Sequence, residues 1–386
     1  MDRPLVSVLL TVYNGEKYLR TAIKSVLEQS YENLELLIYN DGSTDGTETI
    51  VKEFDDVRIT YWRSETNRHI AYGTNFLLKK ASGELFAIMD ADDIWVRDKL
   101  EKQITFLSEH REFNACFSWC DLIDEDGIIR NEELLDYYRL FLAQTNTREY
   151  WLRFFFFNGN RLCNSSAVFT AESYRNIGLH NLFYVQATDM EWWVRFTKKY
   201  AFAVMEEPLV QVRGDFNSTG RTSTNDDASR TRFVNEFECI RLHFFDEIDD
   251  DIFISTFKEY FENKNASTKD ELDCEKILLR LKPHAHTKST PASGLFGLER
   301  AMADERTADL LAEKYGFTTR SAGEYSGKHI FNYRLDDILL DHYREQAEIA
   351  LSDKADAERK LKISEALVES MQERLRLYEN GTASAQ

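Results

Sequence analysis

The chain has little proline and glycine for its length, and it contains no long hydrophobic run. It holds only 4 prolines and 16 glycines in 386 residues, which excludes collagen-like and linker-rich designs. The apolar stretch 154–157 is far shorter than the ~18 residues that a membrane span requires. The first ten residues, MDRPLVSVLL, lack a basic region followed by a small-residue cleavage site. We therefore expect a globular chain with neither a signal peptide nor a transmembrane segment.

Basic charge and cysteine are also scarce. The 48 Lys and Arg residues are outnumbered by 67 Asp and Glu residues, giving a net charge of −19, so we expect no nucleic-acid partner. An odd number of cysteines, 5, fits free thiols in a reducing cytosol better than a disulfide framework. Cys116 and Cys120 are separated by Phe117 and Trp119, a pattern that favours a buried strand over a metal or redox pair.

The first 120 residues alternate between apolar β-rich runs and helical patterns. Strands are predicted over 6–12, 34–39, 58–62, 85–89 and 114–120, with helical patterns in 18–27, 50–54, 70–81 and 96–109. Such alternation predicts an α/β fold, a Rossmann-like, mostly parallel sheet with helices on both faces. In these folds ligands bind outside the carboxyl ends of the strands.

The length and a change of composition predict a second domain. A domain typically has roughly 100–200 residues. The Ser/Thr/Asn/Asp-rich passage 222–229 marks a boundary, so we expect an α/β domain over 1–222 and a mainly α-helical region over 223–386. Its final helix, expected over 347–378, either docks on its own domain or forms a homo-oligomer. The acidic cluster 246–251 and the pair His284 and His286 are interpreted as solvated surface residues.

Two acidic turns follow predicted strands. Asp90, Asp92 and Asp93 follow the end of one predicted strand. Their mutual repulsion is relieved if a divalent cation that bridges phosphate oxygens lies between them. Asp41 follows another strand, where its carboxylate is able to accept a hydrogen bond from a nucleobase N–H. The alternative interpretation of the first turn is an exposed acidic turn, and that of the second is a turn that caps the following helix; neither requires a ligand.

Three segments together resemble the family 2 glycosyltransferases with a GT-A fold, over about residues 4 to 220. They are VSVLLTVYNGEKYLRTAIKSVLEQSYENLELLIYNDGSTDGT, TNRHIAYGTN and GELFAIMDADD, in the order and spacing of that family. The resemblance implies that Thr11 and Tyr13 line the nucleotide base and that Asp41 binds the uracil. It also implies that Asp90 and Asp92 contact the ribose and the Mn²⁺ or Mg²⁺ that bridges the diphosphate. Asp93 is implied as an additional metal ligand.

The chain departs from the family pattern at several positions. Asn40 stands where the family usually has Asp, and Thr74 where it often has Arg, so Arg68 is expected to replace that contact to the diphosphate or the base. Arg213 matches a family arginine that meets the diphosphate, with a structural ion pair as the alternative. Asp215 occupies the position of a histidine in many relatives.

The segment ATDMEWWVR, residues 187–195, resembles the family's acceptor side and implies that Asp189 is the catalytic base. Displacement at the anomeric carbon with inversion requires a carboxylate that takes the proton of the acceptor hydroxyl. The metal stabilises the leaving diphosphate as a Lewis acid. Glu191 is the rival base. Because residues two apart on a helix face different sides, we expect only one of the two carboxylates to reach the cleft. A simple helix cap is the alternative role for Asp189.

The predicted function is that of a metal-dependent inverting glycosyltransferase. It moves a single sugar from a nucleoside diphosphate sugar, UDP-linked, to a hydroxyl of a saccharide or lipid-linked acceptor in surface glycan biosynthesis. A catalytically silent GT-A module and a nucleotidyltransferase are the alternatives. The aromatic segment 137–157 is assigned either to core packing or to acceptor binding through an exposed Trp151. We expect a cytoplasmic protein, peripheral to the inner face of the membrane.

Overall fold

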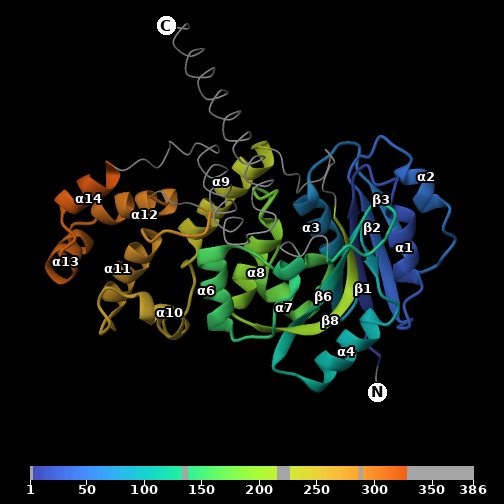
Figure 1. Cartoon of the computed structure of the whole chain (residues 1–386), viewed down its shortest axis with the longest axis horizontal. Coiled ribbons are helices and arrows are strands. Elements are labelled where there is room, and N and C mark those ends of the chain that lie inside the picture. The colour runs from blue at the N-terminus through green and yellow to red at the C-terminus, as the bar shows by residue number, and fades with distance from the viewer. Residues whose placement is uncertain (1–2, 133–137, 215–226, 287–289, 328–386) are drawn as a thin grey trace, which may run out of the picture. The chain divides into compact units, whose positions relative to one another are not determined.

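A computed structural model of the chain describes residues 3–132, 138–214, 227–286 and 290–327 (Figure 1). The strands are β1 (Val6–Val12), β2 (Leu34–Asn40), β3 (Ile59–Arg63), β4 (Leu85–Asp90), β5 (Ile94–Trp95), β6 (Phe113–Ile123), β7 (Val168–Thr170) and β8 (Ala201–Arg213). The helices before β8 are α1 (Leu19–Leu27), α2 (Thr47–Lys52), α3 (Ile70–Lys80), α4 (Lys99–Glu109), α6 (Arg148–Asn158), α7 (Ala171–Ile177) and α8 (Thr188–Thr197). The helices after β8 are α9 (Asp227–His243), α10 (Asp250–Phe257), α11 (Lys269–Arg280), α12 (Ala292–Met302), α13 (Glu305–Tyr315) and α14 (Thr319–Ser326). Short 3₁₀ turns are η1 (Arg139–Phe141), η2 (Asn164–Ser166) and η3 (Lys258–Tyr260).

The eight strands form one mixed sheet in the order β3-β2-β1-β4-β7-β6-β8-β5. The pairs β2–β3, β1–β2, β1–β4 and β6–β8 are parallel, whereas β7 is antiparallel to both of its neighbours and β5 is antiparallel to β8. The predicted α/β fold is therefore confirmed. The short antiparallel strands β5 and β7 were not predicted, because two- and three-residue strands leave too little periodicity to detect.

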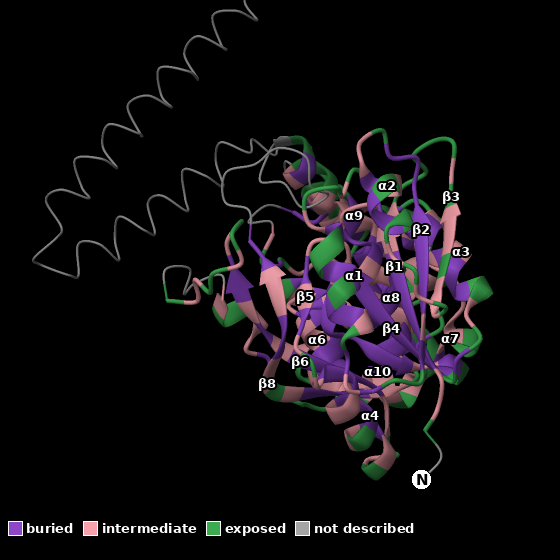
Figure 2. Ribbon diagram, turned by 90° about the vertical axis from the view of Figure 1, so that its right-hand side faces the viewer, coloured by how far each residue is buried: buried purple, intermediate pink, exposed green. Residues whose placement is uncertain are grey.

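Side chains that alternate along β1 divide the interior into two cores. Val8 and Leu10 point into a core covered by α1, α2 and α4, and Leu9 points into a second core on the side of α3, α6 and α8. Figure 2 shows β1, β2 and β4 as buried between helices whose outer surfaces are exposed. Burial on both faces explains why these strands read as continuous apolar runs.

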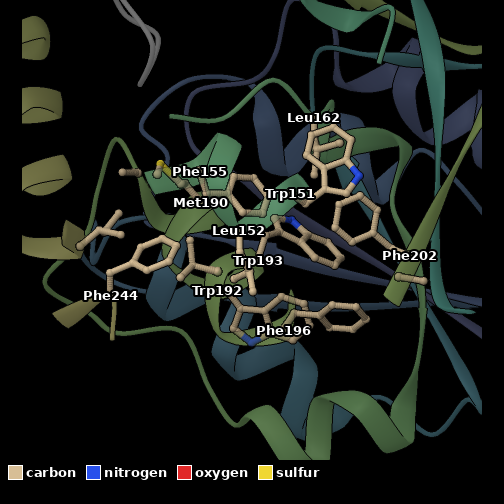
Figure 3. Packing of buried hydrophobic residues seen from close by; sticks show 14 of the residues in the cluster. Trp151, Leu152, Phe155, Leu162, Met190, Trp192, Trp193, Phe196, Phe202 and Phe244 are labelled. Atoms are coloured by element: carbon tan, nitrogen blue, oxygen red, sulfur yellow. The ribbon is translucent and has the colours of Figure 1, made fainter. Parts of the chain in front are cut away.

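The second core is rich in aromatic rings (Figure 3). The Trp151 ring lies 5.1 Å from Phe202 and 5.8 Å from Phe155, between centroids. Trp151 is only 1% exposed. The expectation that Trp151 is an exposed acceptor-binding residue is therefore wrong, and core packing accounts for it. The cause is that α6 packs against α8 and β8 with its apolar face, which leaves this ring no path to solvent.

The helices after residue 226 are continuous with this core. Phe237 of α9, Phe244 directly after it and Phe253 of α10 belong to the same buried cluster as α6 and α8, while α11 to α14 enclose a smaller core of their own. Residues 3–325, within the described ranges, belong to one compact unit. A domain boundary after residue 222 stays a prediction. Asp215 and the helix predicted over 347–378 lie outside the described residues.

The structure corrects one interpretation and supports others. His284 is not a surface residue, because its side chain is buried against Glu238, at 2.7 Å. His286 is half-buried, and its Nε2 lies 2.9 Å from the carbonyl of Asn158. All five cysteines are free, and Cys116 and Cys120 are buried on β6, as predicted. None of the helices within the described ranges is long and apolar enough to cross a membrane.

Candidate active site

The sheet brings the predicted nucleotide-binding residues to one edge. Thr11 at the end of β1 pairs in register with Tyr39 on β2 and with Asp90 on β4. The carboxyl ends of these parallel strands therefore meet at one rim, where ligands of such folds bind. Asp41 lies at the same rim, directly after the last residue of β2, and its backbone amide donates to the carbonyl of Val12 at 2.8 Å.

Asp41 is held by the loop that precedes α3. It is 2% exposed, and both of its carboxylate oxygens accept from the amide of Arg68, at 3.0 and 2.9 Å. Burial raises the pKa of Asp41, and the hydrogen bonds from the amides of Arg68 and His69 oppose that rise. A carboxylate has about four lone-pair positions, so these bonds leave acceptor capacity for a ligand N–H.

The loops after β1 and β2 are joined by side-chain hydrogen bonds. The Asn14 amide donates to Ser43 Oγ at 2.8 Å, and the Thr44 amide donates to Asn14 Oδ1 at 2.9 Å. The Gly15 amide donates to Thr47 Oγ1 at 2.9 Å. Asn14 adopts φ +50°, a conformation that asparagine tolerates better than most residues. The loop that carries Tyr13 is thus organised without any ligand.

Tyr13 and Arg68 lie at the exposed side of this edge. Tyr13 is 48% exposed. The Arg68 guanidinium stacks over the ring of Tyr72, 3.4 Å from its centroid, while its amide holds Asp41. Gly73 allows α3 to pack closely here, because a Cβ at that position would meet Thr11 Cγ2 at 2.5 Å. The residues matched to the nucleotide therefore share one surface.

The acidic turn after β4 concentrates negative charge. Burial, with Asp92 and then Asp189 as neighbouring charges, raises the pKa of Asp90 to about 7. Asp93 is 4% exposed, and its pKa is raised well above its ordinary value, mainly by burial and then by Asp92 and Asp90. Carboxyl groups crowded in this way favour either a shared proton or a bound cation.

Arg213, the last residue of β8, holds this turn through hydrogen bonds. Its amide donates to Asp93 Oδ1 at 3.1 Å, and its Nε donates to the carbonyl of Asp92 at 3.1 Å. Its Nη1 also donates to the carbonyls of Asp124 and Glu125, at 2.5 and 2.8 Å. Arg213 is 6% exposed, so these bonds organise the backbone around the acidic turn.

The acidic turn fits a divalent cation that is shared with a diphosphate. Within the described ranges no three His, Cys, Asp or Glu side chains form a group that would hold a metal on their own. Mg²⁺ is commonly bound through one or two carboxylates together with substrate phosphates, so a complete protein cage is not required. Asp93 faces the Arg213 amide, and the half-buried Asp92 is the better placed of the two predicted ligands.

Asp189 faces the same rim from the start of α8. Its Oδ2 accepts from Asn160 Nδ2 at 2.8 Å, and its charge acts on Asp90. Burial is the main cause that raises the pKa of Asp189 above the ordinary value. A base whose pKa lies nearer neutrality accepts a proton more readily in a transition state, provided that it is still ionised.

Glu191, two residues along α8, is engaged elsewhere. Its two carboxylate oxygens accept from Nε and Nη2 of Arg195, at 2.6 and 2.9 Å. Arg195 in turn donates to the carbonyls of Ile177 and Leu179, at 2.6 and 2.8 Å. The geometry therefore separates the two carboxylates: Asp189 is in electrostatic range of Asp90, and Glu191 completes a structural ion pair.

The turn η2 connects the acidic turn to α8. The amide of Asp90 donates to Ser165 Oγ at 3.3 Å, and the Trp193 indole donates to Asn164 Oδ1 at 3.1 Å. One short turn therefore contacts both β4 and α8, the two elements that carry Asp90 and Asp189.

The roles of two asparagines, one of which contacts Asp189, were not identified from the sequence. Asn160 reaches Asp189 across 29 residues of chain, and Asn75 makes two 2.8 Å hydrogen bonds to the backbone of His180 across 105 residues. Asn75 is the last residue of the motif TNRHIAYGTN, but nothing in the sequence indicates that its partner is His180. For Asn160 a turn-forming Gly159 was the only local signal.

Comparison with known proteins shows the family to which the chain belongs. Residues 7–171 match the Glycosyl transferase family 2 model. EpsE of Bacillus subtilis, named as a glycosyltransferase, is 31% identical over 224 residues, which are 57% of this chain and 77% of EpsE. The chain belongs to glycosyltransferase family 2, and it is a glycosyltransferase.

Two further similarities were found. The Escherichia coli protein named UDP-Glc:alpha-D-GlcNAc-diphosphoundecaprenol beta-1,3-glucosyltransferase WfgD is 44% identical over 129 residues, 33% of this chain and 51% of that protein. The crystal structure of S. aureus TarS with UDP-GlcNAc aligns with a TM-score of 0.52 at 15% identity, over 83% of this chain and 88% of TarS. At that identity the TarS likeness supports the GT-A fold alone.

Proposed function

We propose that this protein is an inverting glycosyltransferase that transfers one sugar from a UDP-sugar to an acceptor hydroxyl, with Asp189 as the base and a divalent cation at the acidic turn. The observation that carries the proposal is that Asp189 accepts from the neutral side chain of Asn160, whereas both carboxylate oxygens of Glu191 accept from Arg195. The resemblance to the family supports the role of Asp189, and the name of WfgD supports UDP.

The chain's own residues account for donor binding. Asp41 accepts the N–H of the uracil, Thr11 and Tyr13 border the base, and Asp90 binds the ribose. Arg68 lies on the same surface and is proposed to contact the base or the diphosphate. Arg213 keeps the acidic turn in shape through its bonds to the backbone of Asp92 and Asp93, and we propose that it also supports the diphosphate from behind.

Asp189 then accepts the proton of the acceptor hydroxyl as that oxygen forms a bond to the anomeric carbon. The bond between this carbon and the diphosphate oxygen breaks, and UDP leaves with the electron pair. Attack from the side opposite the diphosphate inverts the configuration. Asp92, with Asp93 as a further ligand, would hold a Mn²⁺ or Mg²⁺ ion, which would supply Lewis-acid stabilisation of the departing diphosphate.

For the acceptor we propose a saccharide, lipid-linked, in the assembly of a surface glycan. The name of WfgD, which is similar to this chain over a third of its length, specifies a sugar on a diphosphate lipid. Five free cysteines agree with a reducing compartment, so we place the reaction in the cytoplasm at the inner face of the membrane. Self-association through the C-terminal helical region remains part of this proposal.

Calorimetry with UDP, GDP, CDP and dTDP, with and without Mn²⁺, tests the donor side. We expect Mn²⁺-dependent binding that is tightest for UDP. Equal binding with and without the ion contradicts the metal role, and preference for another nucleotide contradicts the donor. Absence of binding by all four favours the catalytically silent module. Release of a nucleoside diphosphate supports glycosyl transfer, and release of pyrophosphate supports the nucleotidyltransferase.

A further inference from the structure

Helix α9 contributes a buried carboxylate to the segment that leads into α8. Glu236 is 3% exposed, and its Oε1 accepts from the amide of Val185 at 2.9 Å. Its Oε2 accepts from the amides of Gln186 and Ala187, both at 2.8 Å. Three successive backbone amides thus converge on one carboxylate, two residues before Asp189.

This contact lies directly before the first turn of α8. Ala187 is the N-cap residue of α8, and an alanine side chain offers no oxygen to the free amides at a helix start. Negative charge near a helix N-terminus is also favourable to the helix dipole. Glu236 supplies this charge from 49 residues further along the chain and binds the amides that lead into the helix, whereas within the first turn the Met190 amide donates to Asp189 Oδ1 at 2.7 Å.

The same helix also contacts the element that carries Asn160. Arg241 of α9 is fully buried, and its Nη1 donates to the carbonyl of Phe156 at 2.6 Å in the last turn of α6. The loop after α11 adds the amide of Ala285, which donates to the carbonyl of Phe157 at 2.8 Å. Asn160 follows α6 directly and donates to Asp189. Helix α9 therefore contacts both segments that position Asp189.

We propose that Glu236 is a positioning residue for glycosyl transfer: by binding the amides of residues 185–187 it fixes the start of α8 and so aims Asp189 at the acceptor hydroxyl. This inference rests on the proposed function of Asp189. It assigns a role in the reaction to a helix outside the matched range 7–171.

The test compares Glu236→Gln and Glu236→Ala with Glu275→Gln in the full-length protein. Glu275 is a matched control, because it is a fully buried helix carboxylate that accepts from two backbone amides, those of Glu262 and Asn263, at 2.9 and 2.7 Å. Its loop does not lead to Asp189. All measurements are made at a temperature at which melting curves show each variant to be folded.

The first readout is hydrogen exchange in a peptide spanning residues 178–190. We expect exchange at residues 185–187 to be at least about tenfold faster in Glu236→Ala, intermediate in Glu236→Gln and unchanged in Glu275→Gln. The second readout is UDP release from the UDP-sugar that the wild type turns over. A kcat about 10- to 100-fold lower at unchanged KM for the donor is expected for Glu236→Ala, with Glu236→Gln retaining part of the rate.

The outcomes separate the two proposals. Wild-type kcat in a folded Glu236→Ala protein, or a loss equal to that of Glu275→Gln, overturns the positioning role. A rise in donor KM without a change in kcat overturns it as well. If Asp189→Asn retains full activity, the proposed base is wrong whatever Glu236 does. If Asp189→Asn is inactive while Glu236→Ala is fully active, only the present inference fails.

Discussion

Asn160 Nδ2 donates a 2.8 Å hydrogen bond to Oδ2 of Asp189, whose Oδ1 accepts from the amide of Met190 at 2.7 Å. An arginine partner stabilises the ionised form of a carboxylate and makes it a weaker proton acceptor, whereas neutral donors do so to a smaller extent. This difference distinguishes Asp189 from Glu191 and determines the first prediction.

Asp189→Asn should lower kcat by about 10²- to 10⁴-fold, the usual contribution of a general base, with little change in UDP affinity. The amide keeps the size of the side chain but does not accept the proton. Turnover and calorimetric UDP binding measure the two effects separately. Glu191→Gln is the paired control: it weakens the contact with Arg195 and should lower the melting temperature more than it lowers kcat. The reverse ranking of the two variants in kcat would transfer the role of base to Glu191.

Asp92→Asn should remove most of the Mn²⁺-dependent part of UDP binding, because a neutral amide is a weaker ligand for a hard cation than a carboxylate is. UDP titrations with Mn²⁺ and with a chelator measure this part as the difference between two affinities. Asp251→Asn, at an exposed position on α10, serves as the charge-matched control and should behave as wild type. An undiminished Mn²⁺ effect in Asp92→Asn would show that the ion binds elsewhere.

Asp41→Asn should reduce discrimination between uridine and cytidine nucleotides. Uracil presents an N–H to the carboxylate, whereas the corresponding ring nitrogen of cytosine is an acceptor. A hydrogen bond to a charged group contributes about 1.5–3 kcal/mol, so the ratio of UDP to CDP affinity should fall by roughly 10- to 100-fold. Competition titrations with the two nucleotides provide the ratio. Asp56→Asn, at a carboxylate paired with Arg58, should leave it unchanged.

Lys99→Met should stabilise the protein. Lys99 is fully buried, its Nζ has no hydrogen-bond partner among the described residues, and it lies 4.0 Å from the centroid of Trp95. Burial lowers its pKa from 10.5 to about 7. Replacing a buried charge with an apolar side chain of similar volume should raise the free energy of unfolding by roughly 1–4 kcal/mol at pH 7.

The same lysine predicts a pH dependence. Between pH 7 and 10.5 the unfolded chain holds a proton that the folded chain has lost, so the free energy of unfolding of the wild type should rise with pH through this window. Below pH 7 both states are protonated and this contribution to the slope vanishes. Lys99→Met should remove the slope, and Lys24→Met, an exposed replacement, should retain it. Denaturant unfolding at several pH values measures both, and identical slopes in the two variants would contradict the assignment.

Trp151→Leu should lower stability without changing acceptor KM. The indole is buried among Phe155, Phe202 and Phe154, and truncating a large core aromatic costs a few kcal/mol, about 3–5 for a full replacement by alanine. Thermal unfolding, together with kinetics on the folded fraction, separates the two effects. A raised acceptor KM at normal stability would restore the earlier assignment of this ring to acceptor binding.

The sequence determined the strands and helices of the sheet's first half, because β1, β2 and β4 are buried on both faces and therefore read as continuous apolar runs. It also determined where the acidic turns stand, since Asp41 and Asp90 lie at strand ends that any parallel sheet brings together. These features depend on local periodicity and on strand direction, and both can be predicted from the amino-acid sequence.

Only the tertiary structure decided which side chains meet. The pairing of Glu191 with Arg195 is local, but the bonds from Asn160 to Asp189 and from Glu236 to residues 185–187 join segments 29 and about 50 residues apart. It also decided that Trp151 and His284 are buried, because burial depends on which neighbouring helix covers a face. A single sequence records which groups are present at each position, and the packing of α6, α8 and α9 selects their partners.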